Sequence, residues 1–334
     1  MSRIEGYRAR IGDVDLALLR GGVTLRDLEL RDGSGTRKRP LFRARSIESS
    51  IHWRPLWRER RLVADVVVVE PEIDLVLAPT AAGTQLGLRP DWPKQLERIE
   101  PLELDGLEVR SGRIHFEDRK HEPAFDVEIS NLEVDGENLA DLRALDDERP
   151  GHVHVSGRAF ESGELVIDIA VDVQADAPDL ALEGRLEDVD MTDLNGLFRA
   201  LGAFDVESGR LSIYAALDAS AGRFSGTVTP IVHDLDVLAD ESGPEASGED
   251  GASWLRTAWE GFIGAVAEVF ENQPEDQQAT RIPVSGEFED PHVGVWQALV
   301  ALLRNAFVQA IEPQMRNAAA ARRAWTGANQ DGDP

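Results

Sequence analysis

Two histidines at positions 152 and 154 are the strongest metal-ligand candidates in this chain of 334 residues. They stand in the segment HVHVSG, which alternates as a β-strand does, so both imidazoles are expected on one face. Imidazole nitrogen is a common ligand of Zn²⁺, but a polar strand face explains the pair equally well. No metal site is therefore predicted.

Two loop motifs resemble ion-binding or phosphate-binding loops but do not have the residue spacing of either. Asp188, Asp190 and Asp193 resemble the start of a calcium loop, but Asp193 occupies the sixth position, where an EF-hand requires glycine. The run Gly33-Ser34-Gly35 lacks the GxxxxGK[ST] spacing of a phosphate loop, and no helical pattern follows it. Neither motif predicts a bound ion or nucleotide.

The residue types that enzymes use as nucleophiles are missing or out of context. There are 0 cysteines, which excludes disulfides, thiolate zinc sites and a cysteine nucleophile. The sequence contains no GxSxG motif, and no histidine stands in a recognisable nucleophile context. The 62 acidic residues are too many for any one pair to stand out as an acid and a base. We therefore predict a protein that is not an enzyme and needs no cofactor.

The charge balance narrows the range of partners. A formal net charge of −27 argues against a nucleic-acid partner, which needs clustered cations, and equally against electrostatic docking on anionic lipid headgroups. With 42% hydrophobic and 29% charged residues the composition is globular. The negative charge is best explained as keeping a large β surface soluble and its edges apart.

No segment predicts a membrane span or an export signal in the chain as given. No stretch reaches about 18 uncharged apolar residues, the length that a spanning helix needs. The N-terminal sequence MSRIEGYRARIGDVD has no apolar run behind its arginines.

The stretch 41–78 predicts part of a large sheet. Extended segments are expected at Ala44–Trp53, Leu62–Val69 and Ile73–Leu77, with a basic corner at Arg54–Arg61. The arginines of this corner either prevent edge-to-edge aggregation or contact lipid headgroups.

Alternation is clearest between residues 152 and 238, where tight polar turns join successive strands. Helices are few: a short one is expected at Met191–Leu201. The predicted fold class is therefore mainly β, a long curled antiparallel meander that forms either an open groove or a partly closed sheet. Its apolar face is expected to include Leu165, Ile167, Ile169, Val171, Val173, Leu211, Ile213 and Leu217.

A one-sided sheet of this size must cover its apolar face. Either it closes on itself as a barrel or sandwich, or it stays open as a trough that binds ligands with long acyl chains.

Four regions follow from these patterns. Residues 1–238 are expected to form the β domain, with an insertion loop at 78–100; 239–252 are an acidic flexible linker; 253–316 hold two amphipathic helices and an intervening strand, RIPVSGEF; and 317–334 are a disordered tail. The two helices are expected to cover the sheet or to gate one end of it. Their apolar stripes include Trp254, Trp259, Phe262, Phe270, Trp296, Leu303 and Phe307.

The order of several segments resembles the AsmA-like family of bacterial cell-envelope proteins, in its branch of domains of unknown function. The resemblance rests on GYRARIGDVDLALLRGGVTLRDLEL, PLFRARSIESSIHWRPLWRERRLVADVVVVEPEIDLV, DVESGRLSIYAALDASAGRFSGTVTPIVHDLDVL and RIPVSGEFEDP followed by the NAF helix. It covers roughly residues 6–312 and includes no catalytic motif.

This resemblance implies a repeating-β-groove protein in the periplasm or cell envelope. Such proteins carry phospholipid acyl chains along an apolar trough and support outer-membrane biogenesis. Family members usually have an inner-membrane helix, which is not found ahead of Gly6-Tyr7 in this chain. The expected partners are a phospholipid or another acyl-chain lipid and membrane proteins, with the oligomeric state open. The alternative is a structural or protein-interaction scaffold with a closed β core and no lipid.

Overall fold

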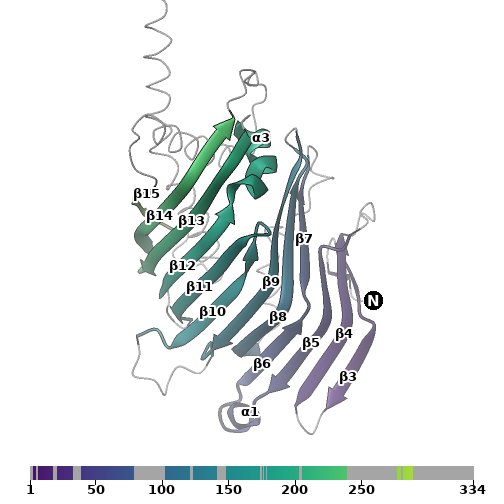
Figure 1. Cartoon of the computed structure of the whole chain (residues 1–334). Helices are drawn as coiled ribbons and strands as arrows, with labels where there is room; N and C mark the ends of the chain where they lie inside the picture. The colour runs from purple at the N-terminus through teal and green to yellow at the C-terminus, as the bar shows by residue number, and fades with distance from the viewer. Residues whose placement is uncertain are drawn as a thin grey trace, which may run out of the picture.

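One large mixed β-sheet contains most of the residues that the structure describes. The computed structural model describes residues 3–4, 7–17, 21–32, 39–78, 102–120, 123–140, 148–173, 175, 177, 179–202, 205–238, 277–279 and 281–288. Within these residues all strands belong to one 16-stranded sheet, which curves and twists as Figure 1 shows. The prediction of a mainly β protein with few helices is confirmed.

The first half of the chain builds the N-terminal part of the sheet. Its strands are β1 (Arg3–Ile4), β2 (Tyr7–Arg10), β3 (Asp13–Ala17), β4 (Gly22–Asp32), β5 (Phe42–Ile51), β6 (Leu62–Val69), β7 (Glu72–Leu77), β8 (Leu102–Asp118) and β9 (Phe125–Glu137).

The second half extends the sheet by antiparallel pairing of neighbours. Its strands are β10 (Gly151–Ala159), β11 (Gly163–Asp172), β12 (Asp179–Asp190), β13 (Asp205–Ser220), β14 (Arg223–Leu238), β15 (Gln277–Ala279) and β16 (Ile282–Glu287). The last two both pair with β14, β15 with residues 231–233 and β16 with residues 223–228.

The prediction of a purely antiparallel meander is wrong at one position in the sheet. β8 runs parallel to both β6 and β7, which follow one another along the same line between β5 and β8. Parallel neighbours need a connection of a dozen or more residues. Residues 78–101, which contain the inserted loop expected at 78–100, provide that length, and 79–101 lie outside the described residues.

β-Bulges allow the long strands to bend without exchanging their faces. Ser111 in β8 has φ +55°, and the pairing of β8 with β9 shifts beside it. The apolar residues accordingly change from odd positions (Val109) to even positions (Ile114). A Cβ on Gly112 would lie 3.2 Å from the Val109 side chain, so both parts of β8 present their apolar residues to the same side.

The same bulge conformation occurs in neighbouring strands. Asp27 in β4, Glu70 between β6 and β7, and Asn131 in β9 have φ values of +52°, +49° and +49°. The Glu70 amide donates to the Arg110 carbonyl beside Ser111 at 2.8 Å, so these bulges adjoin across the sheet. A bulge adds local twist and bend, which accounts for the curvature of the long strands.

Three short helices are described. α1 (Trp53–Glu59) joins β5 to β6 at one end of the sheet, and the 3₁₀ helix η2 (Met191–Leu194) leads into α3 (Asn195–Gly202). The latter two confirm the helix predicted at Met191–Leu201. α3 packs against β13 and β9.

Candidate functional site

Two rows of residues run side by side across twelve strands and define what we call the apolar face. Each row follows directly from the residue pairs of adjacent strands. The first row is Val14, Leu25, Ile47, Val68, Val109, Val134, Val155, Ile167, Gly184, Ala215, Val228 and Ile282. The second is Leu16, Val23, Ser49, Val66, Leu107, Gly136, Val153, Ile169, Leu182, Leu217, Gly226 and Val284. The first row contains no polar side chain on any of the twelve strands.

The row between these two points to the opposite side, which we call the acidic face, because neighbours along a strand alternate. Its members are Asp15, Thr24, Glu48, Val67, Glu108, Asp135, His154, Asp168, Glu183, Ala216, Thr227 and Pro283. The sheet therefore separates an uncharged side from a strongly charged side.

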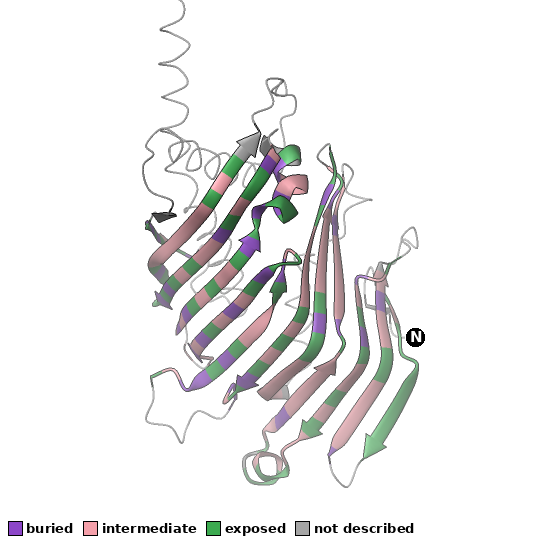
Figure 2. Ribbon diagram, viewed as in Figure 1, coloured by how far each residue is buried: buried purple, intermediate pink, exposed green. Residues whose placement is uncertain are grey.

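Exposure along the apolar face falls from its N-terminal end to its C-terminal end. Leu16 and Val14 are 60% and 47% exposed. At the far end Val284 is 2% exposed (Figure 2). The first row stays half-buried from Leu25 to Val228, whereas the second row is buried from Gly136 to Val284 on every strand except at Gly226, so the packed part of the face follows the second row.

The residues predicted to line a groove divide between two packed clusters at the buried end. Ile169, Val171 and Leu217 belong to one cluster, with Ile167 and Val173 against it. Leu211 belongs to a second cluster around Phe198 of α3, where Ile213 is partly buried. The remaining candidate, Leu165, is half-buried and pairs with Leu186 across β11 and β12.

The residues predicted to gate the groove, from Trp254 to Phe270 and from Trp296 to Phe307, lie outside the described residues. Of the predicted 253–316 region, the structure describes 277–279 and 281–288. β16 lies there, at the position of the predicted strand RIPVSGEF. Val284 belongs to the same buried cluster as Phe224, and the ring of Phe288 lies 5.6 Å from that of Phe224, which places this segment in the cluster.

Both histidines of the predicted metal pair lie on the acidic face. His154 Nδ1 is 2.6 Å from Asp168 Oδ1 on the neighbouring strand. His152 is exposed and pairs in register with Glu137 and Ala170. The structure brings His154 together with a carboxylate and not with His152.

A different histidine, His52, lies between two aspartates that the sequence does not connect. Its Nε2 is 2.7 Å from Asp65 Oδ2, and its Nδ1 is 3.7 Å from Asp105 Oδ2. These three residues could offer metal ligands, but the two ring nitrogens face different carboxylates, and the shorter distance is that of a direct hydrogen bond. The arrangement fits an imidazole that links β6 to β8 better than a metal centre. No sequence spacing could have indicated it, because the parallel pairing of β6 and β8 creates it.

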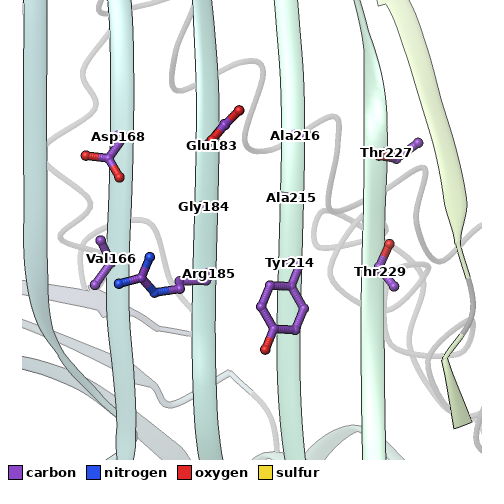
Figure 3. A pocket seen from close by; sticks show the side chains of 10 residues that line it. All are labelled: Val166, Asp168, Glu183, Gly184, Arg185, Tyr214, Ala215, Ala216, Thr227 and Thr229. Carbon is purple, nitrogen blue, oxygen red and sulfur yellow. The ribbon is translucent and has the colours of Figure 1, made fainter.

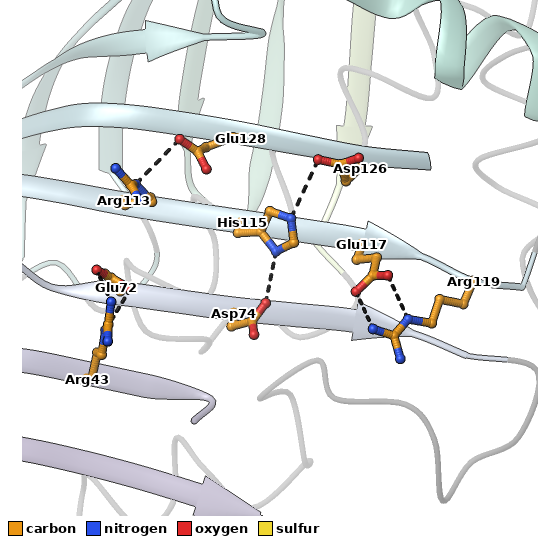
Figure 4. Close-up of polar contacts among 9 residues, drawn as sticks. All are labelled: Arg43, Glu72, Asp74, Arg113, His115, Glu117, Arg119, Asp126 and Glu128. Atoms are coloured by element: carbon orange, nitrogen blue, oxygen red, sulfur yellow. Dashed lines mark hydrogen bonds and ion pairs between the residues drawn. The ribbon is translucent and has the colours of Figure 1, made fainter. Parts of the chain in front are cut away.

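His115 has a similar setting in a polar pocket near the bulges (Figure 4). Its Nδ1 is 2.9 Å from Asp74 on β7, and its Nε2 is 3.6 Å from Asp126 on β9. The pocket also holds the ion pairs of Arg43 with Glu72 and of Arg113 with Glu128. None of the described residues that line it carries a hydroxyl or thiol beside the histidine and aspartate.

A second depression, of about 380 Å³, lies on the acidic face between β11 and β14 (Figure 3). The small residues Gly184, Ala215 and Ala216 form part of its lining, together with Asp168, Arg185 and Tyr214. Tyr214 donates a hydrogen bond to Glu187 at 2.5 Å, and this bond raises the pKa of the phenol. The depression therefore combines charged and hydroxyl-bearing side chains with small apolar ones such as Val166.

The acidic cluster that resembles a calcium loop instead caps a helix. Asp190 is the N-cap of η2: its Oδ1 accepts from the Thr192 amide at 2.9 Å and from the Thr192 hydroxyl at 2.6 Å. Asp193 Oδ2 accepts from the Ser162 hydroxyl. Two of the three carboxylates are thus used in local hydrogen bonds.

Asp190→Ala is expected to lower the free energy of unfolding by about 1 kcal/mol at pH 7, the typical cost of losing an N-cap. The hydrogen bonds from Thr192 lower the pKa of Asp190, so the carboxylate contributes stability above the ordinary aspartate value of about 3.9. That contribution is lost as the pH falls through the lowered value. Urea unfolding of both proteins from pH 7 to pH 3 should show the difference shrink below about pH 4.

Asp188→Asn is the control for this prediction. Asn tolerates the φ of +57° at this position, and the side chain is exposed, so a change within about 0.5 kcal/mol is expected. A constant difference between Asp190→Ala and the unmodified protein down to pH 3 would contradict the cap assignment.

The fold and its two faces define a class: a single-sheet β protein with one acidic and one apolar side. Comparison with protein-family models and with curated proteins found no match to this chain. No helix among the described residues has both the length and the apolar character needed to cross a bilayer.

Proposed function

We propose that this protein shields the acyl chains of phospholipids along the apolar face of its sheet and acts without catalysis in the cell envelope. The observation that carries this proposal is the uninterrupted apolar row across twelve strands, with half-buried and exposed members in its N-terminal part. The AsmA-like resemblance of the sequence supports the same function and a periplasmic location.

The size of the face suits a chain-like apolar ligand. At about 4.8 Å per strand, the row has a contour length of roughly 50 Å. The hydrocarbon core of a whole bilayer is about 30 Å thick, so one acyl chain, reaching about half of that, covers less than half of the row. Each CH₂ group buried on the face contributes about 0.8 kcal/mol. The affinity for lipid would then come from the apolar area that the acyl chain buries, because the first row of the apolar face has no polar side chain.

The exposure gradient assigns different roles to the two ends. Ile169, Val171 and Leu217 are buried by other residues of the chain and act as scaffold. Ligand contacts are assigned instead to half-buried residues such as Leu25, Val68 and Val109. The groove candidates predicted from the sequence are thus placed at the closed end of the proposed path.

Two adjacent valines of β6 give a matched test. Val68 lies on the apolar face and Val67 on the acidic face, and both are half-buried. Val68→Asp is expected to reduce bound phospholipid at least tenfold, because it places a carboxylate in the apolar row. Val67→Asp should retain it. The measurement is mass spectrometry of lipid co-purified with the full chain, together with binding of an apolar fluorescent dye.

Circular dichroism establishes that both variants are folded before they are compared. Phospholipid absent from native and lipid-reloaded protein alike would contradict the proposal, as would equal losses in the two variants. Absence of lipid and of dye would favour the alternative, a scaffold with a closed core, to which the buried clusters at the C-terminal end of the face correspond.

A further inference from the structure

The helix α1 carries a basic and aromatic surface that differs from the rest of the molecule. Residues 53–61, WRPLWRERR, contain four arginines and one glutamate, a formal charge of +3 within a chain of net charge −27. Trp57 is 80% exposed and Trp53 40% exposed. We call the surface of Trp53, Arg54, Trp57, Arg58 and Arg60 the α1 corner.

The arginines of the α1 corner are available to a partner. Arg54, Arg58 and Arg60 are exposed, and none has an ion pair with a described residue. Most other arginines on the sheet are bound to carboxylates, as Arg43 is to Glu72 and Arg45 to Glu70. Within the part of the chain that the structure describes, the cations of this corner therefore have no carboxylate partner, although the protein has a large excess of acid.

Helix geometry places the two kinds of side chain in neighbouring stripes. Trp53 and Trp57 are four residues apart and share one side of α1, and Arg54 and Arg58 form the adjacent stripe. Indole rings favour the region between the hydrocarbon and the headgroups of a bilayer, and guanidinium groups bind phosphate oxygens bidentately. The combination is the one expected at an anionic lipid surface.

Backbone hydrogen bonds hold the α1 corner in a fixed orientation on the sheet. The His52 amide donates to the Val63 carbonyl at 2.8 Å, and the Ile51 amide donates to the Gly21 carbonyl at 2.9 Å. The Trp53 indole packs over Gly21 at the β3–β4 turn. His52, the N-cap residue of α1, is also linked to Asp65 of β6 and lies 3.7 Å from Asp105 of β8.

The position of the corner matches this role. α1 lies at the ends of β5 and β6, which it connects, as Figure 1 shows. Leu16, the most exposed large apolar residue of the apolar face, lies at the same end, because it pairs with Val23 next to the β3–β4 turn. A membrane at the corner would therefore adjoin the open end of the apolar face.

We propose that the α1 corner docks this protein on the surface of an anionic phospholipid bilayer, with its tryptophans in the interface and its free arginines on lipid phosphates. The overall charge repels the rest of the molecule from such a surface, which makes the contact local and oriented. This surface is distinct from the apolar face, so the docking does not depend on acyl-chain binding.

Vesicle flotation of the full chain tests the docking. Vesicles of phosphatidylcholine with one quarter phosphatidylglycerol are compared with vesicles of pure phosphatidylcholine, at about 50 and 500 mM salt. Binding is expected to the anionic vesicles and to weaken at the higher salt, because the Debye length falls below about 5 Å. Arg54→Gln/Arg58→Gln should weaken binding about 25-fold, at about fivefold per arginine. Trp57→Ala should weaken it at least fivefold.

Matched controls use similar residues elsewhere on the protein. Arg8 and Arg10 of β2 are exposed, have no ion pair with a described residue, and lie toward the opposite end of β4, so Arg8→Gln/Arg10→Gln should bind as the unmodified protein does. Tyr214→Ala is the control for Trp57→Ala, since Tyr214 is an exposed aromatic residue on the acidic face.

Three results would overturn the proposal. The first is equal binding to both kinds of vesicle. The second is a loss of vesicle binding in Arg8→Gln/Arg10→Gln as large as that in Arg54→Gln/Arg58→Gln. The third is unchanged vesicle binding in the two α1 variants. The last two would place the lipid contact on another surface of this protein. The apolar-dye assay separates this proposal from acyl-chain binding. Val68→Asp should lose dye binding and keep vesicle binding. Arg54→Gln/Arg58→Gln should lose vesicle binding and keep dye binding.

Discussion

Ile169→Asp is expected to lower the free energy of unfolding by about 3–5 kcal/mol, the cost of an unpaired charge in a packed core. Ile169 is 7% exposed, and its cross-strand partners Val153 and Leu182 are 3% and 2% exposed. A carboxylate there would be surrounded by β-branched and leucine side chains with no cation to pair with. Urea unfolding followed by far-UV circular dichroism measures the change.

The neighbouring residue provides the control. Asp168 lies on the acidic face, and its pair with His154 is more than half exposed, so Asp168→Asn should cost about 1 kcal/mol or less. If Ile169→Asp were as stable as Asp168→Asn, the cluster around Ile169 would be open to water, and this end of the face would belong to the lipid path.

Phe198→Ala is the second substitution with a large expected effect. Phe198 is 0% exposed and joins α3 to a cluster that includes Val189, Met191 and Leu211. Removing a buried phenyl ring costs about 3–5 kcal/mol, because the cavity that remains collapses only partly. Chemical denaturation is the measurement, and Phe198→Leu should recover part of the loss.

Arg199→Gln tests whether that effect comes from packing. Arg199 is the next residue of α3, and its ion pair with Asp205 is largely exposed, so a cost below about 1 kcal/mol is expected. Equal effects of Phe198→Ala and Arg199→Gln would mean that α3 is not held by its buried ring.

Local patterns were sufficient to predict strands and faces. Alternation assigns Ile167 and Ile169 to one face and Asp168 to the other, and the cross-strand pairs confirm this. Alternation does not assign faces to the four valines at 66–69. An unbroken apolar run has no period, so only pairing with β5 and β8 assigns Val68 to the apolar face and Val67 to the acidic face.

The long-range features of the site were not predictable. The parallel neighbours β6 and β8 are separated by a segment without regular pattern, so neither their pairing nor the contact of His52 with Asp65 and Asp105 has a signature in the sequence. The exposure of individual side chains could not be predicted from the sequence either. Leu16 and Leu182 are both leucines in alternating segments, but they are 60% and 2% exposed.

The sequence by itself determined that the chain is mainly β, that its strands have an apolar and an acidic side, and that a basic corner with two tryptophans interrupts them. These properties depend on residues within one strand or turn, where chain geometry alone fixes which side chains share a face. The tertiary structure decided the order of the strands, the position of the open part of the apolar face, and the exposure of the α1 corner next to it. Those properties depend on which distant segments cover one another, and burial is therefore set by the assembled sheet and not by any single stretch of residues.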